Sequence, residues 1–121
     1  MRIDHINIAA PWELLTAVRD FYCQALQLEE GARPDFGIRG YWLYGGGKPL
    51  VHLLESNAHG PAAQPYYLDH VAFELQDLPA YTARLEAMGV SFDVRDFSQY
   101  GFRQVFCKDP CGNGVEANFP G

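Results

Sequence analysis

Three histidines and one glutamate lie in the sequence where they could bind a divalent metal ion. His5 and His52 belong to the first half of the chain, and His70 and Glu116 belong to the second half. Neutral imidazoles and a carboxylate are common ligands of divalent transition metals. Taken singly, each histidine could instead be a half-buried residue that bonds a neighbouring backbone group. As a set of four, they predict a shared metal site, provided that the fold brings them together.

The four residues occupy equivalent places in an internal repeat. Residues 5–8 (His-Ile-Asn-Ile) match residues 70–73 (His-Val-Ala-Phe) at an offset of 65. Residues 51–53 (Val-His-Leu) match residues 115–117 (Val-Glu-Ala) at an offset of 64. Regular loops in any α+β protein can produce such similarities by chance. Two separate segments whose offsets agree within one residue favour a duplicated module.

The first half of the chain predicts one helix and four strands. Alternating apolar and polar residues indicate strands, and an apolar stripe at 3.6-residue spacing after Pro11 indicates a helix. Gly45, Gly46 and Gly47 supply a turn. The expected elements are a strand at 2–9, a helix at 11–26, and strands at 28–32, 38–44 and 50–55.

The second half predicts the same β-α-β-β-β order after a linker. Residues 57–66 contain Gly60, Pro61 and Pro65, a composition typical of linkers. The expected elements are a strand at 67–75, a helix at 78–88 that Gly89 ends, and strands at 90–96, 102–108 and 114–119. We therefore expect one α+β domain over residues 1–121, built from module one (1–56), the linker (57–66) and module two (67–121).

Strand alternation predicts which side chains share a face with the candidate ligands. His5 shares a face with Asn7, and His70 shares a face with Glu74, whereas the aliphatic residues between them face the helices. If an approximate two-fold axis relates the modules, their polar faces meet in a cupped mixed sheet with the helices on its outer face. Three imidazoles and a carboxylate on such a face would lose contacts with water, and a bound cation would compensate for this loss.

The composition excludes several classes of partner. The chain of 121 residues has a net charge of −6 and a pI near 5.0, which disfavours nucleic acid and anionic membranes. No apolar run approaches the roughly 20 residues of a membrane span. Three cysteines make a disulfide framework improbable and are consistent with a reducing compartment, so we expect a cytoplasmic protein.

Several short motifs, taken in order, resemble one known superfamily. They are Ile-Asp-His-Ile-Asn-Ile (3–8), Phe-Tyr (21–22), Tyr-Trp-Leu-Tyr (41–44), Leu-Val-His-Leu-Leu-Glu (50–55), Leu-Asp-His-Val-Ala-Phe (68–73), Gln-Val-Phe (104–106), Asp-Pro (109–110), Gly-Asn (112–113) and Glu116. Together they resemble the vicinal oxygen chelate superfamily of glyoxalases, extradiol dioxygenases, fosfomycin-modifying enzymes, epimerases and bleomycin-sequestering proteins. The resemblance covers nearly the whole chain and implies a homodimer.

The resemblance implies metal ligands at His5, His70 and Glu116. His52 falls on a fourth position, where glyoxalases have a carboxylate and epimerases a glutamine, so the chain departs from both patterns. Phe106 stands where fosfomycin enzymes usually have a tyrosine, and we do not expect that specificity. The implied cofactor is a divalent ion: Ni, Zn, Co, Mn or Fe.

The remaining candidates are pocket residues identified by alternation or adjacency. Asn7, Gln104, Phe106 and Asn118 are expected to bind a small-molecule substrate. Glu116 and Glu74 are the candidate catalytic carboxylates, with Glu74 as a possible second acid or base.

The candidate metal site predicts stabilisation of an enediolate-type intermediate of a small oxygenated substrate, and the resemblance implies a glyoxalase-like lyase or isomerase. Two alternatives remain. An Fe(II) extradiol-type dioxygenase needs two histidines and one carboxylate, which requires His52 to stay outside the ligand set. A metal-free drug-binding resistance protein needs aromatic side chains more than imidazoles.

Overall fold

The structure, a computed structural model, describes residues 1–121, and the chain divides into two compact units. Unit 1 comprises Met1–Ala62 and unit 2 comprises Ala63–Gly121. Each unit contains one α-helix and four strands in the order β-α-β-β-β. The predicted α+β class and the two βαβββ modules are confirmed.

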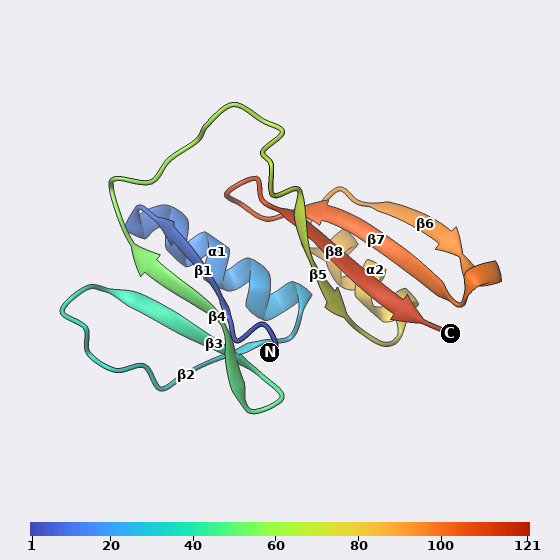
Figure 1. Ribbon diagram of the computed structural model, residues 1–121, viewed down its shortest axis with the longest axis horizontal. Coiled ribbons are helices and arrows are strands. Elements are labelled where there is room, and N and C mark those ends of the chain that lie inside the picture. Colours follow the sequence, from blue (N-terminus) through green and yellow to red (C-terminus); the bar gives the residue numbers. More distant parts are fainter. The chain divides into compact units, whose positions relative to one another are not determined.

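Unit 1 is a four-stranded mixed sheet with one helix (Figure 1). Its elements are β1 (Ile6–Ala10), α1 (Trp12–Ala25), β2 (Glu29–Gly31), β3 (Gly40–Gly45) and β4 (Lys48–Glu55). The strand order is β1-β4-β3-β2, in which β1 and β4 are parallel and the other pairs antiparallel. His52 on β4 therefore lies between Asn7 on β1 and Trp42 on β3.

Unit 2 repeats this topology. Its elements are β5 (His70–Glu74), α2 (Leu78–Ala87), β6 (Asp93–Phe97), the short 3-10 helix η1 (Ser98–Tyr100), β7 (Phe102–Lys108) and β8 (Gly114–Pro120). The strand order is β5-β8-β7-β6, with β5 and β8 parallel. Glu116 on β8 lies between Ala72 on β5 and Phe106 on β7. His52 and Glu116 thus stand on equivalent interior strands.

The helix of unit 1 covers one face of its sheet. α1 contacts β1, β3 and β4. Its buried residues include Leu15, Val18, Tyr22 and Ala25, and the sheet buries Leu43, Val51 and Leu53. Full burial of such a side chain stabilises the fold by roughly 1.5–3 kcal/mol. Because Val51 and Leu53 take the helix side, His52 between them faces the opposite side of the sheet.

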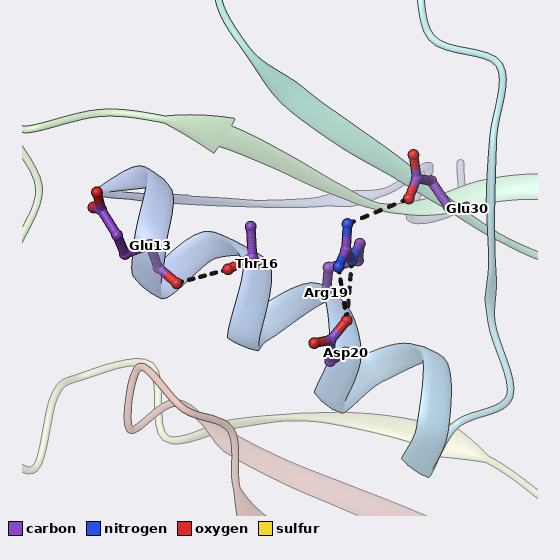
Figure 2. A network of polar contacts seen from close by, with 5 residues as sticks. All are labelled: Glu13, Thr16, Arg19, Asp20 and Glu30. Atoms are coloured by element: carbon purple, nitrogen blue, oxygen red, sulfur yellow. Dashed lines mark hydrogen bonds and ion pairs between the residues drawn. The ribbon is translucent and has the colours of Figure 1, made fainter.

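A polar network on α1 connects the helix to β2 (Figure 2). Figure 2 shows Arg19 between Asp20 on the same helix and Glu30 on β2. The guanidinium lies 3.0 Å from the Asp20 carboxylate and 3.7 Å from that of Glu30. It also lies over the Tyr41 ring, 4.8 Å from the centroid. The polar edge of this helix is therefore fixed by contacts to two strands, β2 and β3.

The helix of unit 2 packs through two buried residues, Tyr81 and Leu85. The Tyr81 ring lies 5.6 Å from that of Phe119 on β8, and its hydroxyl contacts the Cys107 sulfur on β7 at 3.9 Å. Val105, Val115 and Ala117 complete this buried face of the sheet. The other face of β8 carries Glu116 and Asn118, as alternation requires.

The turn between β7 and β8 is organised by a buried carboxylate. Asp109, 4% exposed, accepts hydrogen bonds from the backbone N–H groups of Cys111 and Asn113 and from the Asn113 amide. Gly112 follows with a φ of 87°, which glycine adopts easily. This turn, Asp-Pro-Cys-Gly-Asn-Gly at residues 109–114, therefore sets where β8 begins.

Three strands begin three or four residues later than the sequence pattern predicts. β1 begins at Ile6 instead of residue 2, β5 at His70 instead of residue 67, and β6 at Asp93 instead of residue 90. The first paired residue of β1 is Ile6, which pairs with Val51, so the residues before it have no neighbouring strand. Ile3 is accordingly 85% exposed. The residue pattern shows where a strand can form, but the strand forms only where a partner strand supplies the hydrogen bonds.

The structure contains no helix with the length and apolar character needed to cross a membrane.

Candidate metal centre

In unit 1 the two candidate ligands form a stack of rings. His5 lies one residue before β1, and its ring stacks on that of His52 with centroids 3.8 Å apart and an angle of 8° between the planes. The opposite face of His52 stacks on Trp42 at 4.2 Å and 20°. Phe36 extends this row, with its ring 6.2 Å from Trp42. The sequence predicted the proximity of His5 and His52, but not the aromatic rings beside them.

The His52 ring is held by its neighbours and by the backbone. Its Nε2 lies 3.1 Å from the Pro49 carbonyl oxygen, to which an Nε2–H can donate. Burial lowers the pKa of His52, and the nearby charge of His5 lowers it further. The ring is therefore kept neutral at neutral pH, which is the state that a metal ligand requires.

The stacking limits what His5 and His52 can ligate together. The lone pair of an imidazole nitrogen lies in the plane of its ring, and the metal lies along it at about 2.0–2.1 Å. Because the two ring planes are nearly parallel, an ion in the plane of one ring lies outside the plane of the other. In this arrangement only one of the two histidines can bind a given ion.

In unit 2 a histidine and a buried glutamate meet at ligand spacing. His70 Nε2 lies 3.1 Å from Glu116 Oε1. Two ligand atoms that bind one ion at right angles, each through a bond of about 2.1 Å, are about 3 Å apart. The other oxygen of Glu116 accepts a 3.4 Å hydrogen bond from Gln104 Nε2. The rings of His70 and Phe106 pack edge to face, with their centroids 5.5 Å apart.

Glu116 is unusual among the acidic side chains in being buried. Asp109 and Glu116 are the buried charged residues of the chain, at 4% and 5% exposed. Asp109 receives three short hydrogen bonds from its own turn, whereas Glu116 has the long bond from Gln104 and the contact with His70. A buried carboxylate with so little compensation fits a cation as a further partner.

A glycine brings β8 close to the His70 backbone. Gly114 pairs with His70, and a Cβ atom at this position would collide with the Asp69 carbonyl oxygen and crowd the His70 Cβ. The missing side chain at Gly114 therefore lets the two strands approach where the His70 and Glu116 pair forms.

The other predicted residues of unit 2 lie on the face that carries Glu116. Asn118 lies in register between Glu74 on β5 and Gln104 on β7, and its Oδ1 is buried without a hydrogen-bond partner. Glu74 is exposed. Arg95 on β6, which the sequence reasoning missed, lies over the Phe106 ring at 4.6 Å from the centroid. Arg95 pairs with Gln104 in the sheet. Strand alternation therefore places it on the same face as the candidate pocket residues, and this is the signal that could have identified it.

Each unit therefore contributes part of the predicted set. Unit 1 brings His5 and His52 together, with Asn7 beside His52 in the sheet but exposed. Unit 2 brings His70 and Glu116 together with Gln104 and Phe106 around them. Neither unit gathers three or more His, Cys, Asp or Glu side chains that could hold a metal ion.

Solved structures with this fold serve different functions. Manganese-bound FosX, a fosfomycin resistance protein of Listeria monocytogenes in complex with a dihydroxypropylphosphonic acid, matches with a TM-score of 0.75 and 20% identity over 99% of this chain and 92% of that one. Lactoylglutathione lyase of Agrobacterium tumefaciens matches with a TM-score of 0.67 and 20% identity, covering 98% and 92%. TnmS3, an antibiotic binding protein of Streptomyces sp. CB03234, matches with a TM-score of 0.67 and 26% identity, covering 100% and 99%.

A comparison with curated proteins gave no significant match. A family model does match, and it covers residues 2–117, nearly the whole chain. Its description is the Glyoxalase/Bleomycin resistance protein/Dioxygenase superfamily, the group that the sequence motifs resemble. The chain therefore belongs to this superfamily.

Proposed function

We propose that the protein is a divalent-metal-dependent, glyoxalase-like lyase or isomerase acting on a small oxygenated substrate. The observation that carries the proposal is the buried Glu116 carboxylate with His70 Nε2 at 3.1 Å. His5, His70 and Glu116 are the proposed ligands. His52 becomes a fourth ligand only if its ring turns away from His5, because the stacked rings do not share a coordination plane.

A bound ion would act as a Lewis acid that stabilises negative charge developing on a substrate oxygen. The protein's own residues hold and orient the reactants. Gln104 fixes Glu116 through its amide hydrogen bond, and the unpaired Oδ1 of Asn118 can accept a hydrogen bond from a substrate hydroxyl. Phe106 supplies an apolar wall beside His70. Glu74, exposed at the end of β5, is the proposed second acid or base, and Asn7 is a proposed polar contact.

An Fe(II) extradiol-type dioxygenase is the second candidate, and the stacking of His52 favours it. With His52 held between His5 and Trp42, the set that remains is two histidines and one carboxylate. This set leaves positions on Fe(II) for a substrate and dioxygen. The family description includes dioxygenases as well as glyoxalases.

Metal analysis of protein purified without chelator tests the proposal. We expect stoichiometric divalent metal in the wild type and its loss in His70→Ala and Glu116→Gln. His59→Ala is the matched control, because His59 lies in the exposed segment between the units' strands, where its Nδ1 bonds Ser56. Ni, Zn, Co or Mn with turnover of the hemithioacetal of methylglyoxal supports the isomerase.

The other outcomes identify the alternatives. Fe(II) with oxygen uptake supports the dioxygenase. Protein that takes up none of these ions contradicts both enzymes and leaves a metal-free drug-binding protein. His52→Ala distinguishes the two ligand sets, because unchanged metal affinity in this variant places His52 outside the set.

The proposal includes a cytoplasmic homodimer. All three cysteines, Cys23, Cys107 and Cys111, are free thiols, which suits a reducing compartment. Sedimentation of the purified protein at several concentrations tests the dimer.

A further inference from the structure

The same aspartate–histidine contact occurs once in each unit. His5 Nδ1 lies 2.7 Å from Asp4 Oδ2, and His70 Nδ1 lies 2.8 Å from Asp69 Oδ2. The two pairs are 65 residues apart, which is the offset of the internal repeat. Each unit thus gives the same ring nitrogen the same partner.

These contacts determine which nitrogen is left for another ligand. A neutral imidazole carries one proton, and a carboxylate can only accept it. Two carboxylates compete for that proton in His70, because Asp69 lies 2.8 Å from Nδ1 and Glu116 lies 3.1 Å from Nε2. The shorter contact favours the proton of neutral His70 on Nδ1 and leaves the lone pair on Nε2. Nε2 is the atom that lies 3.1 Å from the Glu116 carboxylate. His5 is held in the same way by Asp4.

His52 lacks this arrangement. The residue before it is Val51, and its Nε2 contacts the Pro49 carbonyl oxygen instead of a carboxylate. The three histidines therefore fall into two classes. In His5 and His70 the neighbouring aspartate contacts Nδ1 and leaves the Nε2 lone pair free to bind a metal ion. In His52 the Nε2 atom is instead hydrogen-bonded to the backbone.

We propose that Asp4 and Asp69 are positioning residues that hold His5 and His70 in the tautomer whose Nε2 binds the metal ion. This inference rests on the proposed metal-dependent function. The aspartate side chains are 92% and 75% exposed, so packing does not explain their orientation toward the rings. Carboxylates that accept the second N–H of a ligating histidine typically strengthen metal binding about 10- to 100-fold.

The first test measures the tautomers directly in metal-free protein at a pH where the histidines are neutral. Long-range proton–nitrogen NMR correlations distinguish a ring protonated on Nδ1 from one protonated on Nε2. We expect the Nδ1–H form at His5 and His70. In Asp69→Ala, His70 should shift toward the Nε2–H form that an unconstrained histidine side chain prefers, while His5 stays unchanged. Asp4→Ala should give the reciprocal result.

Two further variants separate the hydrogen bond from the charge. Asp69→Asn keeps an acceptor oxygen and should retain the Nδ1–H form at His70. Asp93→Ala removes an exposed carboxylate from β6 of the same unit without removing the contact to His70, and should leave the tautomer unchanged. Unchanged tautomers in Asp69→Ala would overturn the inference.

The second test is a calorimetric titration with Co²⁺ or Ni²⁺ alone. Asp69→Ala should raise the dissociation constant about 10- to 100-fold, whereas Asp93→Ala should match the wild type. Wild-type affinity in Asp69→Ala overturns this inference and leaves the proposed function intact. A wild type that binds no divalent ion, while its tautomers respond as expected, overturns the proposed function instead.

Discussion

Cys107 lies beneath α2, where its sulfur contacts the Tyr81 hydroxyl, and burial raises the pKa of its thiol. A raised pKa lowers the thiolate fraction at neutral pH, and the thiolate is the reactive form. We predict that iodoacetamide labels Cys107 only after unfolding, whereas Cys23 and Cys111, which are partly exposed, react slowly in the native protein. Mass spectrometry of native and denatured samples measures this. Native labelling of Cys107 as fast as that of Cys23 would contradict the packing.

His52 predicts a pH dependence of stability. Burial holds its pKa below the ordinary value of 6.5, so the unfolded chain takes up a proton at a higher pH than the folded one does. Its contribution to stability is therefore present above about pH 6.5 and is lost as the pH falls through the lower, folded pKa. We predict that between about pH 7 and about pH 5 the free energy of unfolding falls more in the wild type than in His52→Gln.

Chemical denaturation across this pH range measures the effect. His59→Gln is the control for replacing a histidine by glutamine, because His59 is exposed. Equal slopes in the wild type and His52→Gln would show that the ring stack does not disfavour the charged imidazole.

At the residue scale, the sequence predicts faces and not ring orientations. Alternation correctly paired His70 with the strand face that carries Glu116, because the side-chain period of a strand is two residues. The same rule gives no information about rotamers. The stacking of His52 between His5 and Trp42 depends on the side chains of three chain segments and could not be read from their spacing.

At the scale of elements, the start of α2 depends on one side chain. Asp77 caps the helix by accepting a 3.1 Å hydrogen bond from the Ala80 N–H, and its backbone is left-handed with a φ of 65°. We predict that Asp77→Ala lowers the free energy of unfolding by about 1–2 kcal/mol, since alanine neither caps nor favours this conformation. Asp77→Asn should be nearly neutral because asparagine does both. Urea denaturation of the two variants compares them, and equal losses would rule out this role for the cap.

Element types were easier to predict than element boundaries. The helices were predicted at 11–26 and 78–88 and lie at Trp12–Ala25 and Leu78–Ala87, because proline, apolar spacing and Gly89 are local signals. The starts of β1 and β6 were predicted too early, because pairing with a distant strand decides them. The 3-10 helix at Ser98–Tyr100 was not predicted at all.

At the scale of the whole molecule, a metal ion bound by the proposed ligands should stabilise the native state against unfolding. A ligand that binds only the native state adds about 2.7 kcal/mol at a free concentration of 100 times its Kd. We predict that the preferred ion raises the melting temperature and that chelator reverses the change. Glu116→Gln should abolish this response. A melting temperature that does not depend on the ion would contradict metal binding to the native state.

The strand order also has a consequence for synthesis on the ribosome. In each unit the first strand pairs only with the last one. β1 therefore cannot pair until β4 has been synthesised, and β5 cannot pair until β8 has been synthesised. Until residues 51–55 emerge, the edge of β1 has no hydrogen-bonding partner and can pair with another nascent chain. Each half of the protein is thus left open until its final segment is translated, and that segment is the one that carries His52 or Glu116.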